Sequence, residues 1–226
     1  MLPEPVLTDR IEQGRRVPVL VWRLDAPLRA ISSAPFGGGI GTRRWVVNAT
    51  VPMSYRRDDP DAHLAELSAG LGLTGPGVGL LTGVDVAEVV TRTDDGVQVW
   101  ATVGLGAPIW AAADPLATEP VSGTGRPGTV NIVAALPGKL TDAALVNAVL
   151  TMTEAKAQAL RELDLAATGT ATDAVVVLCP SEGPAAPYGG PRSRWGAPLA
   201  RATRAAVRAG GALPCVPWST RLGYSE

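Results

Sequence analysis

Lys156 is the first residue whose type and place in the sequence could do chemistry. Residues 145–165, LVNAVLTMTEAKAQALRELDL, have the period of an amphipathic helix. The apolar residues on one face of this helix are Leu145, Val149, Met152, Leu160 and Leu163. Lys156 falls in the middle of that face. Either its stem covers apolar surface while the ammonium reaches water, or the ammonium is partly buried and held by a carboxylate or an anionic intermediate.

Two acidic residues could be the partner of this ammonium. Glu154 points to the opposite side of the helix, so it can take part only if both sides are covered, and a solvated surface position is the alternative. Asp173 ends the loop TGTATD, at the start of a valine-rich strand. Functional residues often occupy such loops, although Asp173 could instead cap its own turn.

Asn48 and Asn131 lie in predicted strands, where asparagine is depleted, so we expect a polar role for both. The alternative is a turn at the end of a strand. The glycine loops PFGGGIG, which contains Gly38 and Gly39, and TGTATD expose backbone N–H groups that could bind an oxyanion. Such loops are more often tight turns, and neither completes a phosphate-binding motif.

His63, the only histidine, lies at the edge of the apolar face of a predicted helix, so we expect a structural role. A Ser-His-Asp triad is then excluded, and hydrolysis would use a hydroxyl or a water activated by lysine or a carboxylate. Cys179 and Cys215 are isolated and fit a reducing cytosol. Because no cluster of metal-binding residues is visible, we expect no metal and no cofactor.

The elements that must position these residues form an α+β pattern. Strands are predicted at 17–24, 29–34, 43–52, 78–84, 86–93, 97–105 and 128–136, and a turn-rich loop that enters a buried strand is predicted at 167–179. Helices are predicted at 60–71, from 142, and at 197–210. We expect a mixed, largely antiparallel sheet, or sheets, covered by helices, in a layered sandwich. Residues 43–105 and 128–180 share the order strand, helix, strand, which predicts a duplication with pseudo-two-fold symmetry, unless common turn residues coincide by chance.

Composition narrows the class of protein. The chain has 226 residues, of which 46% are hydrophobic, and this suits one domain with a sizeable core. A net charge of -1 favours neither nucleic acid nor a membrane surface as a partner. No apolar run is long enough to span a membrane, and no apolar signal core opens the chain. We expect a cytoplasmic protein that acts on a small molecule, with a homo-oligomer as one possible state.

Several motifs together resemble the adenosylcobinamide amidohydrolases of the CbiZ type. The matching segments are GGG (37–39), VN (47–48), LLTG (80–83), ATVG (101–104), GTVNIV (128–133), TEAKAQAL (153–160), ATGTATDAV (167–175) and YGGP (188–191). They occur in the family's order from about residue 30 to residue 210. TEAK and TGTATD at this spacing are specific, whereas each alone is not. Members are similar in length, so we expect a single amidohydrolase domain over residues 1–226.

The resemblance implies an enzyme of corrinoid salvage. Such enzymes hydrolyse the amide that joins the aminopropanol arm of adenosylcobinamide to its corrin ring, which gives adenosylcobyric acid. The predicted catalytic residues are Glu154, Lys156, Asp173 and Asn131. The predicted substrate-binding residues are Asn48, Gly38, Gly39, Thr82, Thr129, Thr170 and Thr172. On this hypothesis Glu154 or Asp173 is the base, and Lys156 and Asn131 hold the oxyanion together with glycine-loop amides.

Two other functions fit the same residues. One is a corrinoid- or nucleotide-binding protein that performs no chemistry. The other is an unrelated amidase of the N-terminal-nucleophile type, which would cleave itself before Thr129 or Thr172.

Overall fold

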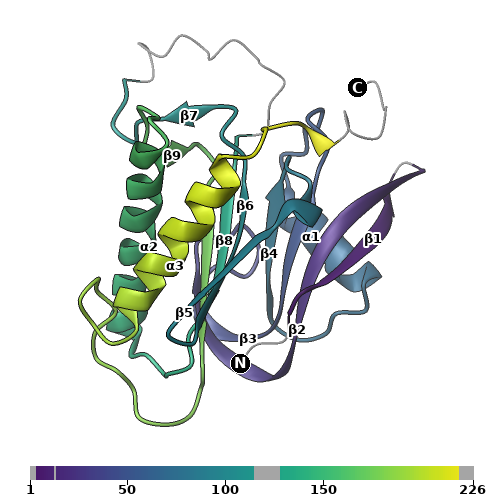
Figure 1. Ribbon diagram of the computed structural model, residues 1–226. Coiled ribbons are helices and arrows are strands. Elements are labelled where there is room, and N and C mark those ends of the chain that lie inside the picture. The colour runs from purple at the N-terminus through teal and green to yellow at the C-terminus, as the bar shows by residue number, and fades with distance from the viewer. Residues whose placement is uncertain (1–3, 13, 115–127, 219–226) are drawn as a thin grey trace.

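The computed structural model describes residues 4–12, 14–114 and 128–218, which form one large sheet and three helices (Figure 1). The strands of the sheet are β1 (Val6–Glu12), β2 (Arg15–Ser32), β3 (Gly39–Thr50), β4 (Gly77–Thr82), β5 (Val90–Asp94), β6 (Val97–Val103), β8 (Val130–Ala135) and β10 (Ala174–Cys179). The helices are α1 (Pro60–Gly70), α2 (Asp142–Glu162) and α3 (Gly196–Gly211). β7 (Pro108–Ile109) and β9 (Gly169–Thr170) form a separate two-stranded sheet.

The strand order in the large sheet is β4-β3-β2-β10-β8-β6-β5, and β1 pairs with β2. The pairs β3/β4 and β8/β10 are parallel, and the other pairs are antiparallel. The pairing of β2 with β3 shifts register between Arg23 and Leu28. Residues 15–23 of β2 belong to a first wing with β1, β4 and residues 45–49 of β3. Residues 29–32 of β2 pair with residues 39–42 of β3 on one side and with β10 on the other, and so join a second wing of β10, β8, β6 and β5.

The two wings pack face to face. Alternate residues of each strand point to opposite sides of the sheet, so a strand contributes side chains both to the core between the wings and to the outer face. In β8, Ile132 packs toward α2 and α3, whereas Val133 lies in a second buried cluster with Leu80 of the first wing. The rings of Trp22 and Trp100 meet edge to face in this cluster, with centroids 5.8 Å apart. α1 packs on the outer face of the first wing. The predicted fold class is confirmed, with α2 and α3 outside one wing and α1 outside the other (Figure 1).

Local sequence explains the ends of the helices. The side chain of Thr141 accepts a hydrogen bond of 3.2 Å from the N–H of Ala144 and so caps α2 as predicted. α1 begins at Pro60, which suits a first turn because proline lacks the N–H that has no helical acceptor there.

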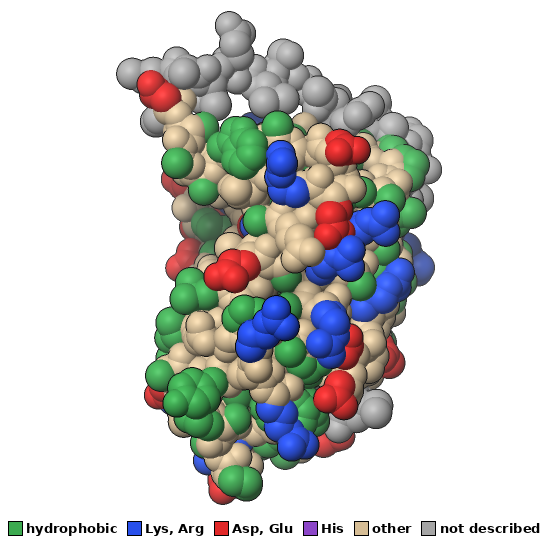
Figure 2. All heavy atoms as spheres, turned by 60° about the vertical axis from the view of Figure 1, so that its left-hand side comes forward, with side chains coloured by type: hydrophobic (Ala, Val, Ile, Leu, Met, Phe, Trp, Pro, Cys, Tyr) green, Lys and Arg blue, Asp and Glu red, His purple; other side chains and the backbone are tan. Residues whose placement is uncertain are grey.

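The arginines of α3 lie on a solvated, mixed-charge face, as Figure 2 shows for the helical side of the molecule. Arg201 pairs with Asp94, and Arg204 pairs with Glu162. Basic and acidic side chains are interspersed on this face (Figure 2).

Three predictions about elements need correction. β1 was not expected, and the strands predicted at 17–24 and 29–34 are one continuous β2. The strand predicted at 86–93 begins only at Val90, because residues 86–88 form a 3-10 turn capped by Asp85. Both predicted repeats contain a helix between two parallel strands, but the duplication itself stays a prediction. In the described ranges, no helix is long and apolar enough to cross a membrane.

Gly79 allows α1 to approach β4 closely. A Cβ at this position would lie 2.8 Å from the side chain of Leu64, so we expect Gly79→Ala to destabilise the fold by about 1–3 kcal/mol through overpacking. Gly70, at the end of α1, has open space around it, and Gly70→Ala should be neutral or stabilise by up to ~1 kcal/mol. Urea unfolding of both variants tests this. Equal stabilities would show that α1 is free to move away from the sheet.

Candidate active site

Lys156 and Asp173 form a buried ion pair. Lys156 lies on the buried face of α2, and its ammonium contacts Asp173 Oδ2 from a side chain that is only 10% exposed. The Asp173 side chain is equally buried. The partner of Lys156 is therefore the acid of the TGTATD loop, and the pair is largely buried.

Asp173 holds three further donors. Oδ1 accepts from the N–H of Val130 at 2.8 Å and from the hydroxyl of Thr170 at 2.5 Å, and Oδ2 accepts from the N–H of Thr170 at 3.0 Å. With Lys156, each oxygen then has two donors, which fills the hydrogen-bonding capacity of a carboxylate. These contacts favour a charged carboxylate that positions its neighbours. The hypothesis of Asp173 as a base would require one donor to leave first.

Gly169 makes room for this ion pair. A Cβ on Gly169 would overlap both Lys156 Nζ and Asp173 Oδ2. The glycine of the TGTATD loop is therefore required for the close approach of the backbone to two charged groups, rather than for an unusual turn.

Asn48 and Asn131 meet between the two wings. Asn131 Nδ2 donates to Asn48 Oδ1 and to the carbonyl oxygen of Leu81, at 2.9 Å each, and Asn48 Nδ2 donates to Thr102 Oγ1 at 3.0 Å. The carbonyl oxygen of Leu81 can only accept a hydrogen bond, so the atom of the Asn131 side-chain amide that faces it must be Nδ2. A polar role was expected of both asparagines, and the structure joins them in one hydrogen-bond network.

A cavity of about 460 Å³ opens beside this network. It lies at the edge of the sheet where the parallel strands β8 and β10 begin and β4 ends. Its polar lining consists of Ser33, Tyr55, Thr82, Thr129, Asn131, Thr172 and Asp173. The hydroxyls of Thr129 and Thr172 lie 2.6 Å apart, within hydrogen-bonding distance. Its apolar lining includes Val51, Leu80 and Leu81.

The structure brings most of the predicted site residues to this edge. Asn131, Thr82, Thr129, Thr172 and Asp173 line the cavity, and contacts with these residues hold Asn48, Thr170 and Lys156.

Three predicted residues lie elsewhere. Glu154 is exposed on α2 and does not line the cavity. Gly38 and Gly39 are exposed at the start of β3, and the carbonyls of Gly37 and Gly38 accept hydrogen bonds from Arg43. Arg43 therefore binds the carbonyl oxygens of this loop, and an oxyanion-binding role for its backbone N–H groups stays a prediction.

Sequence reasoning missed Tyr55, which lines the cavity and contacts His63. The Tyr55 hydroxyl lies 3.1 Å from His63 Nδ1, the two rings stack, and Glu12 lies 3.7 Å from His63 Nε2. Burial lowers the pKa of His63 and raises the pKa of Tyr55. The eight-residue separation between Tyr55 and His63 crosses a loop, so no helical period could have indicated the contact.

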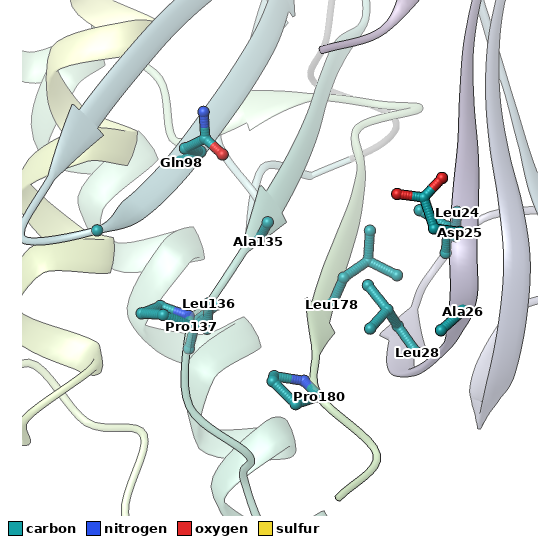
Figure 3. A pocket seen from close by; sticks show the side chains of 11 residues that line it. Leu24, Asp25, Ala26, Leu28, Gln98, Ala135, Leu136, Pro137, Leu178 and Pro180 are labelled. Carbon is teal, nitrogen blue, oxygen red and sulfur yellow. The ribbon is translucent and has the colours of Figure 1, made fainter. Parts of the chain in front are cut away.

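A second cavity, of about 280 Å³, lies at the opposite edge of the sheet, where β8 and β10 end (Figure 3). Its polar side chains are Asp25 and Gln98. It is less suited to chemistry, because no hydroxyl, lysine or histidine lines it. In the part of the chain that the structure describes, no group of three or more His, Cys, Asp or Glu side chains could hold a metal ion.

Comparison with known proteins decides the family. The family model described as adenosylcobinamide amidohydrolase matches residues 3–215. The chain belongs to the adenosylcobinamide amidohydrolase family. It is 36% identical over 191 residues to the adenosylcobinamide amidohydrolase of Halobacterium salinarum, covering 83% of this chain and 80% of that protein. It is 27% identical over 187 residues to the adenosylcobinamide amidohydrolase of Methanosarcina mazei, covering 79% of this chain and 88% of that protein.

Membership of the adenosylcobinamide amidohydrolase family confirms the resemblance seen in the sequence and, with it, the class of enzyme, an amidohydrolase. The fold is also similar to the crystal structure of the PH0078 protein from Pyrococcus horikoshii OT3. That similarity has a TM-score of 0.50 over 92% of this chain and 83% of that chain, at 12% identity, and it concerns the fold alone.

The ion pair should make both of its members important for stability. Lys156→Met and Asp173→Asn should each cost about 3–5 kcal/mol, because each leaves a buried polar partner uncompensated. The double variant should cost less than the sum of the two. Urea unfolding measures all three, and Glu154→Gln, which changes an exposed residue of the same helix, should leave stability unchanged. Strict additivity would mean that the pair is not coupled.

His63 should make stability depend on pH. Its folded-state pKa lies below the ordinary 6.5, so the unfolded chain binds the proton more tightly. The stability contributed by neutral His63 is therefore present above about pH 6.5 and is lost as pH falls toward the folded-state pKa. Thermal unfolding between about pH 7.5 and pH 5 should show a steeper loss in wild type than in His63→Gln. Parallel curves would contradict a buried, neutral His63.

Proposed function

We propose that the chain hydrolyses the amide that joins the aminopropanol arm of adenosylcobinamide to the corrin ring, and so supplies adenosylcobyric acid for corrinoid salvage in the cytoplasm. The observation that carries the proposal is the cavity at the start of β8 and β10, where Asn131, Thr129, Thr172 and Asp173 converge. Family membership supports the substrate, since both curated relatives are named adenosylcobinamide amidohydrolase.

The size of the cavity suggests how the substrate would bind. A volume of about 460 Å³ suits a side arm with its amide and is far too small for a whole corrinoid. The arm would therefore enter, and the ring would stay at the mouth. The apolar wall of Val51, Leu80 and Leu81 suits the aliphatic part of the arm.

Hydrolysis adds water to the amide carbonyl, breaks the C–N bond, and leaves a carboxylate and a protonated amine. The hydroxyls of Thr129 and Thr172 would hydrogen-bond the reacting groups at the cavity wall. Lys156 acts through Asp173, whose carboxylate holds the N–H of Val130, beside Thr129, and so fixes that wall. Tyr55, backed by His63, would exchange the proton that the leaving amine requires.

Incubation with adenosylcobinamide, followed by chromatography for adenosylcobyric acid, tests the proposal. Thr129→Val, Thr172→Val and Tyr55→Phe should each lower kcat/KM by roughly 10- to 1,000-fold, because each removes one hydroxyl from the cavity. Asp25→Asn, in the cavity of Figure 3, should keep wild-type turnover. A parallel incubation with a chelator should give the same rate.

Other outcomes would identify the rival functions. Tight binding of the corrinoid with no product would indicate a binding protein. An intact mass smaller than that of the full chain, with a new terminus at Thr129 or Thr172, would indicate an N-terminal-nucleophile hydrolase. Loss of activity in Asp25→Asn alone would move the reaction to the opposite edge of the sheet.

A further inference from the structure

Asn131 carries a buried acceptor that the network between the wings does not use. The residue is 1% exposed, and its Oδ1 has no hydrogen-bond partner among the described residues. Leaving a buried amide oxygen without a donor costs stability, so such an atom calls for an explanation. Asn131 also lines the cavity, so its side chain lies at the edge of the proposed reaction site.

The hydrogen bonds of Nδ2 fix the orientation of the Asn131 side-chain amide. Both hydrogens of Nδ2 are committed, one to Asn48 Oδ1 and one to the carbonyl of Leu81. Asn131 therefore cannot donate to an oxyanion without giving up one of these bonds, and the donor role expected from the sequence does not fit this geometry. What the side chain still offers is the unpartnered acceptor Oδ1.

Several other acceptors of the cavity lining already have at least one donor. Each oxygen of Asp173 has two, Thr82 Oγ1 accepts from the N–H of Val84, and Ser33 Oγ accepts from the N–H of Val175. Among the described side chains of the lining, Asn131 thus presents the carbonyl oxygen to which an N–H would bind. A secondary amide brings one such N–H, which needs an acceptor once it leaves water.

We propose that Asn131 Oδ1 accepts the N–H of the scissile amide, and so selects a secondary amide over an ester and orients its leaving nitrogen. This inference rests on the proposed function. The hydrogen bond would strengthen as the nitrogen gains a proton and a positive charge, because hydrogen bonds to charged groups are the stronger ones. Asn131 would then favour the transition state over the bound substrate.

The test compares the cobinamide amide with an ester analogue that has oxygen in place of the amide nitrogen. Wild type should bind the ester about 10- to 100-fold more weakly, because an ester oxygen would face Oδ1 and offer no hydrogen. Asn131→Ala should bind the amide and the ester about equally. Its kcat on the amide should fall by a similar factor, about 10- to 100-fold, whereas its kcat on the ester should change little.

A matched control separates this role from the network. Thr102→Val removes the acceptor of Asn48 Nδ2 and leaves both bonds of Asn131 in place, so it should keep the wild-type preference for the amide. The preference is measured on wild type as well, so the result does not depend on the folding of Asn131→Ala. Equal binding of amide and ester by wild type would overturn the inference.

Turnover tests the proposed amidohydrolase reaction, and the relative binding of amide and ester tests the proposed role of Asn131. A wild-type preference for the amide without any hydrolysis would support the role of Asn131 and overturn the proposed amidohydrolase reaction on this substrate. Hydrolysis of both compounds with no preference would support the reaction and overturn the role of Asn131. A preference for the amide that persists unchanged in a folded Asn131→Ala would also overturn it.

Discussion

The carboxylate of Asp173 ties together parts of the chain that lie far apart in sequence. It binds Lys156 from α2, the N–H of Val130 at the start of β8, and both polar groups of Thr170. A charge that is taken out of water must find such partners, and here they are supplied by three different segments. The position of the cavity wall at Thr129 and Thr172 follows from this constraint, because these residues are the direct neighbours of Val130 and Asp173.

The contact between Asn48 and Asn131 adds a second constraint across the two wings. Apolar clusters allow neighbouring layers to slide by small amounts, whereas a hydrogen bond between two side-chain amides requires one alignment. The bond of 2.9 Å places the end of β4, with Leu81 and Thr82, opposite the start of β8. The space left between them is the cavity, so its shape depends on polar alignment as much as on apolar packing.

Much of this arrangement could be predicted from the sequence. The helical period around Lys156 offered a partly buried ammonium as one of two alternatives, and the Gly/Thr loop offered Asp173 as one of two partners, because both signals are local. Tyr55 and the free acceptor of Asn131 could not be predicted, since each depends on which atoms meet across a loop or between wings. Gly38, Gly39 and the exposed Glu154 lie outside the cavity, because a local motif does not fix where the fold places its residues.

The bond between Asn48 and Asn131 joins residues that are 83 positions apart in the chain. Closing so long a loop carries an entropic cost that nearby contacts must first offset, and folds rich in such distant pairings form slowly. The hairpin of β5 and β6 and the capped α2 are local and can form early, whereas the cavity exists only after the wings have docked. The chain should therefore acquire this cavity at the last step of folding.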